Sequence, residues 1–97
     1  MATVTKPAQA GTLESSDIVV TVAPGQPGSG IVIELESIVL AQYGQAIRQT
    51  ITATLTENDI TDIYIKAVDR GALDCTIRAR TLAALGRAGA LAGREMI

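Results

Sequence analysis

A run of β-branched residues near the start of the chain constrains the fold most. Asp17 to Ala23 reads Asp-Ile-Val-Val-Thr-Val-Ala and is followed by Pro24, which indicates a strand that ends there. Ala10 to Leu13 forms a shorter candidate strand just before it. The polar residues between the two are turn formers, because short polar side chains bond to their own backbone. The sequence therefore predicts a β-hairpin with Ser15 and Ser16 at its bend.

A third strand and a long helix are predicted next. Pro24 to Gly30 is a flexible loop, and Ile31 to Leu35 alternates as a strand does. Ser37 is the expected N-cap of a helix, and Asn58 is expected to close it in a left-handed conformation. Ile51 to Thr56 is rich in β-branched residues and also suits a strand, but a longer apolar stripe at helical spacing decides for helix. That stripe consists of Leu40, Tyr43, Ile47, Ile51 and Leu55.

The last third of the chain predicts one more strand and one more helix. Ile60 to Val68 alternates, with Ile63, Ile65 and Ala67 on one face and Tyr64 and Lys66 on the other. Asp74 is the expected N-cap of the second helix, whose apolar positions are Ile77, Thr81, Leu82, Leu85 and Ala88. Cys75 to Arg80 also alternates, which leaves the start of this helix open. Gly86, Gly89 and Gly93 predict that its end frays.

The order β-β-β-α-β-α predicts an α+β fold, in which two helices pack on one face of a small, mainly antiparallel sheet. Residues 1–97 are expected to form one domain, with 1–9 a loose lead-in and 92–97 a frayed tail.

The composition excludes several functional classes. Aromatic residues are 2% of the chain, so the core must be aliphatic and no platform for stacking bases is present. A net charge of −2 argues against nucleic acid, which needs a basic partner surface. No apolar run reaches the roughly 20 residues of a membrane span, and the first residues lack a signal peptide. The single Cys75 forms no intramolecular disulfide. The expectation is a cytoplasmic protein.

The sequence offers little for catalysis. It contains no histidine and no cluster of potential metal ligands, and the loop from Pro24 to Gly30 lacks the lysine of a P-loop. A nucleophilic serine needs a base, and neither lysine, Lys6 or Lys66, lies near Ser15 in sequence. We expect no catalytic residue and no metal site. A serine in a turn is ordinarily only a turn residue, but modification by another enzyme needs no more than an exposed hydroxyl.

Charged residues and the cysteine give weaker signals. Glu14 and Asp17 flank the serines and are expected to be solubilising. Cys75 is predicted to be a buried structural residue, the alternative being a thiol activated by the helix N-terminus. Four arginines gather near the end of the chain and form either a solvated helical face or a docking patch for an acidic partner; they are Arg78, Arg80, Arg87 and Arg94.

Two motifs, taken in order, resemble the acyl carrier (γ) subunit of citrate lyase. The first is Ala-Gly-Thr-Leu-Glu-Ser-Ser-Asp at 10–17, and the second is Gly-Ala-Leu-Asp-Cys at 71–75 followed by Ile-Arg-Ala-Arg at 77–80. The length and the segment Tyr-Gly-Gln-Ala-Ile-Arg at 43–48 agree as well. In that family the serine of a Leu-Glu-Ser-Gly-Asp motif carries 2′-(5″-phosphoribosyl)-3′-dephospho-CoA through a phosphodiester. The matching residue is Ser15, and the sequence departs from the pattern by having Ser16 where glycine is usual.

The resemblance implies a non-catalytic carrier subunit. Its arm would carry acetyl and citryl thioesters between an α subunit, which exchanges the acyl groups, and a β subunit, which cleaves the citryl thioester. Further implied partners are the enzymes that attach and acetylate the arm. A negative hairpin end at Glu14 and Asp17 predicts docking to basic residues. The alternatives are a carrier of a malonate decarboxylase or citramalate lyase complex, and a plain interaction module in which Ser15 is only a turn residue.

Overall fold

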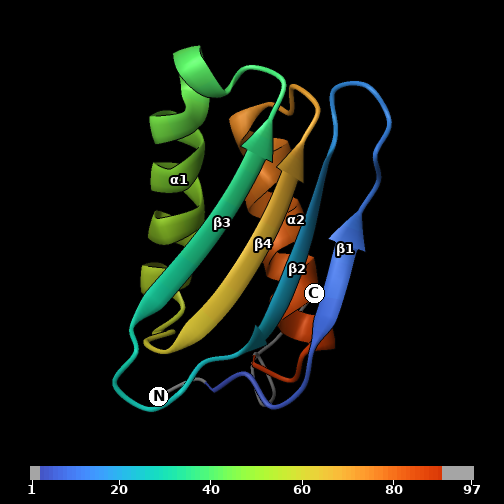
Figure 1. Ribbon diagram of the computed structural model, residues 1–97. Coiled ribbons are helices and arrows are strands. Elements are labelled where there is room, and N and C mark those ends of the chain that lie inside the picture. Colours follow the sequence, from blue (N-terminus) through green and yellow to red (C-terminus); the bar gives the residue numbers. More distant parts are fainter. Residues whose placement is uncertain (1–2, 91–97) are drawn as a thin grey trace.

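The computed structural model describes residues 3–90 and has the predicted order of elements (Figure 1). These are β1 (Ala8–Gly11), β2 (Ile18–Pro24), β3 (Ile31–Ser37), α1 (Leu40–Glu57), β4 (Ile63–Asp69) and α2 (Asp74–Arg87). The segment 51–56, whose composition also suited a strand, lies within α1. The start of α2, which the sequence left open, falls at Asp74.

The strands form one mixed sheet in the order β1-β2-β4-β3. β2 pairs antiparallel with β1 and with β4, whereas β3 and β4 are parallel. A parallel neighbour needs a crossover connection, and α1 supplies it between β3 and β4. Both helices lie behind the sheet in the view of Figure 1. The predicted α+β fold, with both helices on one face of a mainly antiparallel sheet, is confirmed.

The core lies between the sheet and the helices and is aliphatic, as the composition requires. Ile63, Ile65 and Ala67 of β4 point into it and are fully buried. Tyr64 and Lys66 alternate with them and lie on the open face of the sheet. Fully buried residues of the other elements complete the core, among them Ile18, Val20, Val22, Ile51, Leu55 and Leu85.

The predicted cap of the first helix is wrong. Ser37 is the last residue of β3, and Val39 occupies the N-cap position without a side-chain hydrogen bond. The Ser37 hydroxyl donates to Asp69 Oδ2 at 2.8 Å and accepts from the Val39 N–H at 3.1 Å. The buried carboxylate of Asp69 therefore holds the hydroxyl that was expected to cap the helix.

Two further end positions are corrected. Asp74 is the first residue of α2, and Leu73 is the N-cap, with no side-chain cap. Asn58 is the C-cap of α1 as expected, but its φ is −106°, and the left-handed residue is Asp59 with φ of 60°. The Asn58 side chain instead donates to the Thr54 carbonyl at 2.8 Å.

The start of the described chain is packed rather than loose. Val4 is only 3% exposed and belongs to the core. Both the N–H and the hydroxyl of Thr5 donate to the Ala88 carbonyl, at 3.1 and 2.9 Å. The expectation of a loose lead-in over 1–9 therefore fails for its described part, and 92–97 lies outside the described residues. No helix of the described residues is long and apolar enough to cross a membrane.

Candidate functional site

The serine pair lies in a tight turn between β1 and β2, as predicted. The Asp17 N–H donates to the Glu14 carbonyl at 3.2 Å, which places Ser15 and Ser16 at the two central positions of the turn. Both serines are exposed. The backbone of Ser16 is left-handed, with φ of 65°. This conformation favours glycine and explains physically why the family pattern has glycine at this place.

Gly11 makes the entry into this loop possible. Its φ is +105°, and a Cβ built on it would lie 1.8 Å from the Ile18 carbonyl oxygen. Any other residue at position 11 would have to displace the backbone of β2. The close approach of the two strands is therefore fixed at the base of the loop that carries the serines.

Asp17 closes the loop from the other side, and it is buried rather than solubilising. Its carboxylate accepts from the Thr12 hydroxyl at 2.6 Å and from the Ile18 N–H at 2.7 Å. The Arg80 guanidinium of α2 donates to both carboxylate oxygens, at 3.1 and 2.8 Å. Hydrogen bonds from Arg80, then from Thr12 and Ile18, hold the pKa of Asp17 well below its usual range. The loop is thus anchored to α2 by a charged pair.

A second turn, between β4 and α2, is hydrogen-bonded to the serine turn. The Ser16 N–H donates to the Arg70 carbonyl, and the Arg70 N–H donates to the Asp17 carbonyl, both at 2.8 Å. Asp69, which precedes Arg70 in the chain, is buried. Its carboxylate accepts hydrogen bonds from the N–H groups of Gly71 and Ala72 at 3.1 and 3.0 Å. Sequence reasoning missed the role of Asp69; an aspartate between a strand and a glycine turn was the only signal for it.

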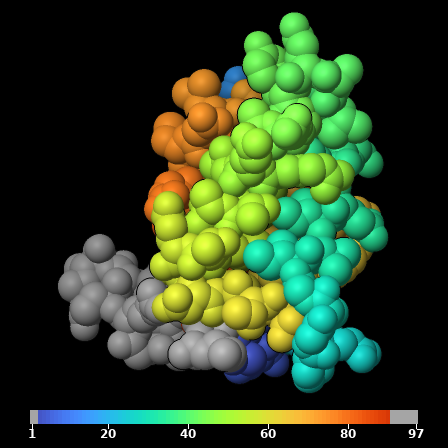
Figure 2. All heavy atoms as spheres, turned by 90° about the vertical axis from the view of Figure 1, so that its left-hand side faces the viewer, coloured from blue at the N-terminus to red at the C-terminus, as the bar shows by residue number. Residues whose placement is uncertain are grey.

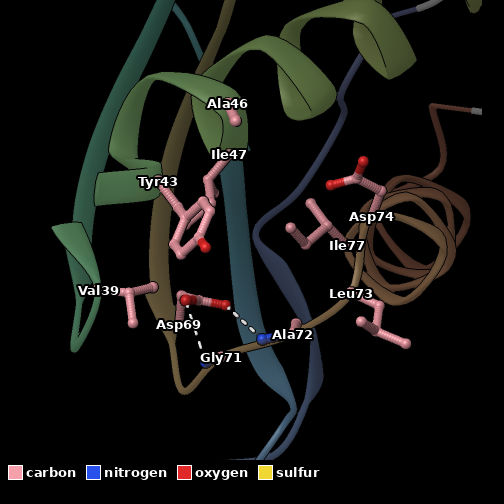
Figure 3. Close-up of a pocket in the computed structure, with 10 residues that line it drawn as sticks. All are labelled: Val39, Tyr43, Ala46, Ile47, Asp69, Gly71, Ala72, Leu73, Asp74 and Ile77. Carbon is pink, nitrogen blue, oxygen red and sulfur yellow. Dashed lines mark hydrogen bonds between the residues drawn. The ribbon is translucent and has the colours of Figure 1, made fainter. Parts of the chain in front are cut away.

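A cavity of about 440 Å³ opens between the first halves of α1 and α2. Figure 3 shows the Tyr43 ring reaching from α1 toward Asp69, Ile77 pointing into the space from α2, and Leu73 pointing away. The lining residues are Val39, Tyr43, Ala46, Ile47, Asp69, Gly71, Ala72, Leu73, Asp74 and Ile77. Figure 2 shows the start of α1 in green and the start of α2 in orange at the same end of the molecule.

Large apolar side chains are exposed mainly at this end. Leu13 lies in the serine loop, Ile38 between β3 and α1, and Leu73 just before α2; they are 57%, 68% and 69% exposed. Leu40 and Tyr43 on the first turns of α1 are also exposed. We call these five residues the apolar rim. Large apolar side chains exposed at one end of a molecule are typical of a binding surface.

The prediction that Cys75 is a buried structural residue is wrong. Cys75 lies in the first turn of α2 and is exposed. The burying positions of this helix begin at Ile77, so the side chain at 75 points to solvent. Apolar packing therefore does not explain Cys75.

Of the four arginines near the end of the chain, the three that the structure describes form contacts within the molecule. Arg80 is paired with Asp17, and Arg78 forms an ion pair with Glu57 at the end of α1. Arg87 donates to the Gln9 carbonyl of β1 at 2.8 Å. These side chains join α2 to the serine loop, to α1 and to β1. Neither of the two interpretations from the sequence, a solvated helical face or a docking patch, predicted these contacts. Arg94 lies outside the described residues.

Comparison with known proteins finds acyl carrier proteins, both by family model and by individual relatives. The acyl carrier protein family model described as malonate decarboxylase delta subunit (MdcD) matches residues 5–88. The citrate lyase acyl carrier protein of Streptococcus uberis is 54% identical over 84 residues, which are 87% of this chain and 81% of that protein. That of Lacticaseibacillus casei is 54% identical over 82 residues, or 84% and 79% of the two chains.

A solved structure shares the fold. It is the crystal structure of a Pseudomonas malonate decarboxylase hetero-tetramer in complex with malonate. One of its chains aligns with a TM-score of 0.74 and 23% identity, covering 91% of this chain and 89% of that one. At this identity the likeness concerns the fold.

Proposed function

The chain belongs to the family of the citrate lyase acyl carrier proteins, and we propose that it carries acyl groups on a prosthetic arm joined to Ser15. The single observation that carries this proposal is the position of Ser15. It is exposed at the centre of a turn that is fixed to β4 and α2 by hydrogen bonds and by the pair of Asp17 with Arg80. A mount for a mobile arm needs this combination of an accessible hydroxyl and a rigid base.

The turn geometry favours Ser15 over Ser16 as the attachment residue. The backbone of Ser16 is left-handed and its N–H is bonded to Arg70, so position 16 sets the shape of the turn, as glycine would. Ser15 precedes it and matches the serine of the family motif. In this proposal the hydroxyl of Ser16 is incidental.

Attachment of the arm must be the work of another enzyme. The chain contains no histidine. Of the two carboxylates that flank the serines, the exposed Glu14 forms no hydrogen bond with Ser15 in the described structure, and Asp17 is paired with Arg80. A carboxylate whose pKa is lowered in this way is a poor proton acceptor. Among residues 3–90, no group is positioned by a hydrogen bond to act as a base on Ser15, so we infer that Ser15 is not a nucleophile on its own.

We propose that the arm is 2′-(5″-phosphoribosyl)-3′-dephospho-CoA, joined to Ser15 through a phosphodiester. Its thiol would carry acetyl and citryl groups between the α and β subunits of a cytoplasmic citrate lyase, which cleaves citrate to acetate and oxaloacetate. Tethering raises the effective concentration of the thioester at each active site without requiring tight binding at either. The chain itself then supplies the mount and the docking surface.

A malonate decarboxylase complex is the second candidate, because the family model and the aligned structure bear that name. Identity favours citrate lyase, at 54% against 23%. Reconstitution of this protein with the subunits of either complex separates the two, since only the matching complex should turn over its substrate.

Intact mass tests the attachment directly. Protein purified from its native host should show a large adduct, released by phosphodiester cleavage and mapped to Ser15. Ser15→Ala should abolish the adduct and all lyase turnover while leaving the fold intact, and Ser16→Gly should retain both. An adduct that survives Ser15→Ala and disappears in Ser16→Ala would assign the arm to Ser16. If the native protein carries no adduct, the alternative function as a plain interaction module is favoured.

A further inference from the structure

We propose that the cavity between α1 and α2 holds the thioester end of the arm between its visits to the partner active sites. This inference rests on the proposed function, because it concerns an arm that starts at Ser15. It adds a resting site on the carrier itself, formed by the first halves of both helices and the turn between β4 and α2.

The cavity is placed beside the attachment point. The turn that carries Ser15 is bonded to Arg70 through two backbone hydrogen bonds of 2.8 Å. Gly71 and Ala72, the next residues along the chain, line the cavity. The turn from which the arm would leave is thus joined by backbone hydrogen bonds to the segment that forms one wall of the cavity.

The lining suits an uncharged thioester. Val39, Ile47 and Ile77 supply apolar surface, and the Tyr43 ring faces the space from one side (Figure 3). The carboxylate of Asp69 already accepts hydrogen bonds from Ser37, Gly71 and Ala72. It therefore forms part of the cavity wall and does not offer a free acceptor to the ligand.

The same lining discriminates between acyl groups. A volume of about 440 Å³ lies within the usual range of small-ligand sites, roughly 300–1,000 Å³. The exposed carboxylate of Asp74 also lines the cavity and repels other carboxylates. An acetyl thioester therefore fits this site better than a citryl thioester with its several negative charges. Sheltering the acetyl form would also keep water from a reactive ester.

Exposed apolar side chains around the opening support an apolar occupant. Leu40 and Tyr43 are exposed on the α1 side, and Leu73 on the α2 side. A folded-back arm that lies across this opening would cover apolar surface that otherwise faces water. The covalent link at Ser15 makes the arm the occupant with the highest local concentration.

A spin label on the arm tests the resting site without any measurement of activity. The full chain would carry the arm and the substitution Cys75→Ser, because the exposed thiol of Cys75 would otherwise be labelled too. A nitroxide attached to the arm thiol should broaden the amide signals of Ala46, Ile47, Ala72 and Ile77 more than those of Thr21 or Lys66. Reduction of the nitroxide should restore the signals.

A matched pair of variants provides the control. Ala46→Phe fills the cavity from an exposed position of α1, and Ala53→Phe places the same side chain two helical turns later, outside the lining. We expect Ala46→Phe to abolish the selective broadening and to hasten spontaneous hydrolysis of the acetylated arm, and Ala53→Phe to change neither. Equal broadening throughout, or broadening that persists in Ala46→Phe, would overturn the resting site.

Signals that change only when partner subunits are added would overturn it too, and would show that a protein covers the cavity. Failure to find any adduct on Ser15 would overturn the proposed function as well, so the two failures are distinguishable by mass.

Discussion

Ser16 adopts a backbone conformation that is costly for a residue with a side chain. Its φ of 65° is left-handed, and this conformation costs about 1–2 kcal/mol in an L-residue other than glycine. Ser15, by contrast, is not among the described non-glycine residues with positive φ. The two adjacent serines therefore differ in backbone strain as well as in their proposed roles.

Ser16→Gly should stabilise the unmodified protein. The relief of about 1–2 kcal/mol equals or exceeds the roughly 0.4–1 kcal/mol lost because glycine is more flexible in the unfolded chain, so a net gain of about 0–1.6 kcal/mol is expected. Thermal unfolding should show a Tm raised by several degrees. Ser15→Gly is the matched control and should lower the Tm. A lower Tm for Ser16→Gly would mean that the left-handed turn is not the dominant conformation.

Cys75 is expected to react quickly with thiol reagents in the native state, because it is exposed at the start of α2. Cys75→Ala should change the free energy of unfolding by no more than about 0.5 kcal/mol, as surface substitutions usually do. Labelling in native buffer followed by mass spectrometry measures the first, and denaturant unfolding the second. Slow labelling together with a loss of more than about 1 kcal/mol would restore a buried structural role.

At the scale of elements, the connections between β1 and β2 and between β4 and α2 behave as one unit. Asp17 from the first accepts from Arg80 in α2, and Arg70 from the second exchanges backbone hydrogen bonds with Ser16 and Asp17. The end of the sheet that carries Ser15 is therefore braced by charge and by backbone bonds together.

The Asp17–Arg80 pair should make stability fall in acid. Because the pKa of Asp17 is lowered in the folded state, the unfolded chain binds more protons at acid pH. The contribution is thus fully present above about pH 4, the usual range of an aspartate, and is lost as the pH falls below it. Asp17→Asn should unfold more readily at neutral pH and show a flatter decline of Tm below pH 4 than the parent. Parallel declines in the two proteins would show that Asp17 is not the group responsible.

The sequence predicted the elements well because their signals are local. The alternation in Ile63 to Ala67 depends only on neighbours along the chain and appears as predicted. The apolar stripe of the first helix is confirmed from Ile47 to Leu55, whereas its first two members, Leu40 and Tyr43, are exposed. The serine turn was found for the same reason. Family resemblance singled out Ser15 among the turn residues, which turn chemistry alone did not.

Two of the errors, at Ser37 and Asp17, concern side chains whose partners are distant in sequence. Ser37 bonds to Asp69, and Asp17 to Arg80, 32 and 63 positions away. Local rules assigned Ser37 to a helix cap and Asp17 to the solvent. The cavity was missed for the same reason, since its lining comes from two helices and a turn that meet only in the folded chain.

At the scale of the whole molecule, one end differs from the rest. Ser15, the cavity and the apolar rim gather there, whereas of the large apolar side chains exposed among residues 3–90 only Val32 on β3 lies outside the rim. The end is also less negative than its sequence indicated, because Arg80 compensates the charge of Asp17. A lysine at position 17 would disrupt this buried pair, so charge reversal there cannot report on docking alone.

Docking to the larger subunits should therefore depend on apolar contact more than on charge. In the proposed function the arm starts at Ser15, so the end with Ser15 must face the partner. Leu13, Ile38 and Leu73 are the most exposed large apolar side chains at this end. Leu73→Ser and Ile38→Ser should each weaken association by an amount typical of an interface contact, about 1–2 kcal/mol or roughly 5- to 30-fold in Kd. Glu14→Lys should have a smaller effect, and added salt should change the affinity little, because apolar contact is not screened.

Val32→Ser is the matched control, since Val32 is exposed on the open face of the sheet and away from Ser15. Titration of the carrier variants against the partner subunits at low and high salt measures all four. If Glu14→Lys and salt abolish binding while the rim variants bind normally, the charge of this end directs docking, as the sequence first indicated.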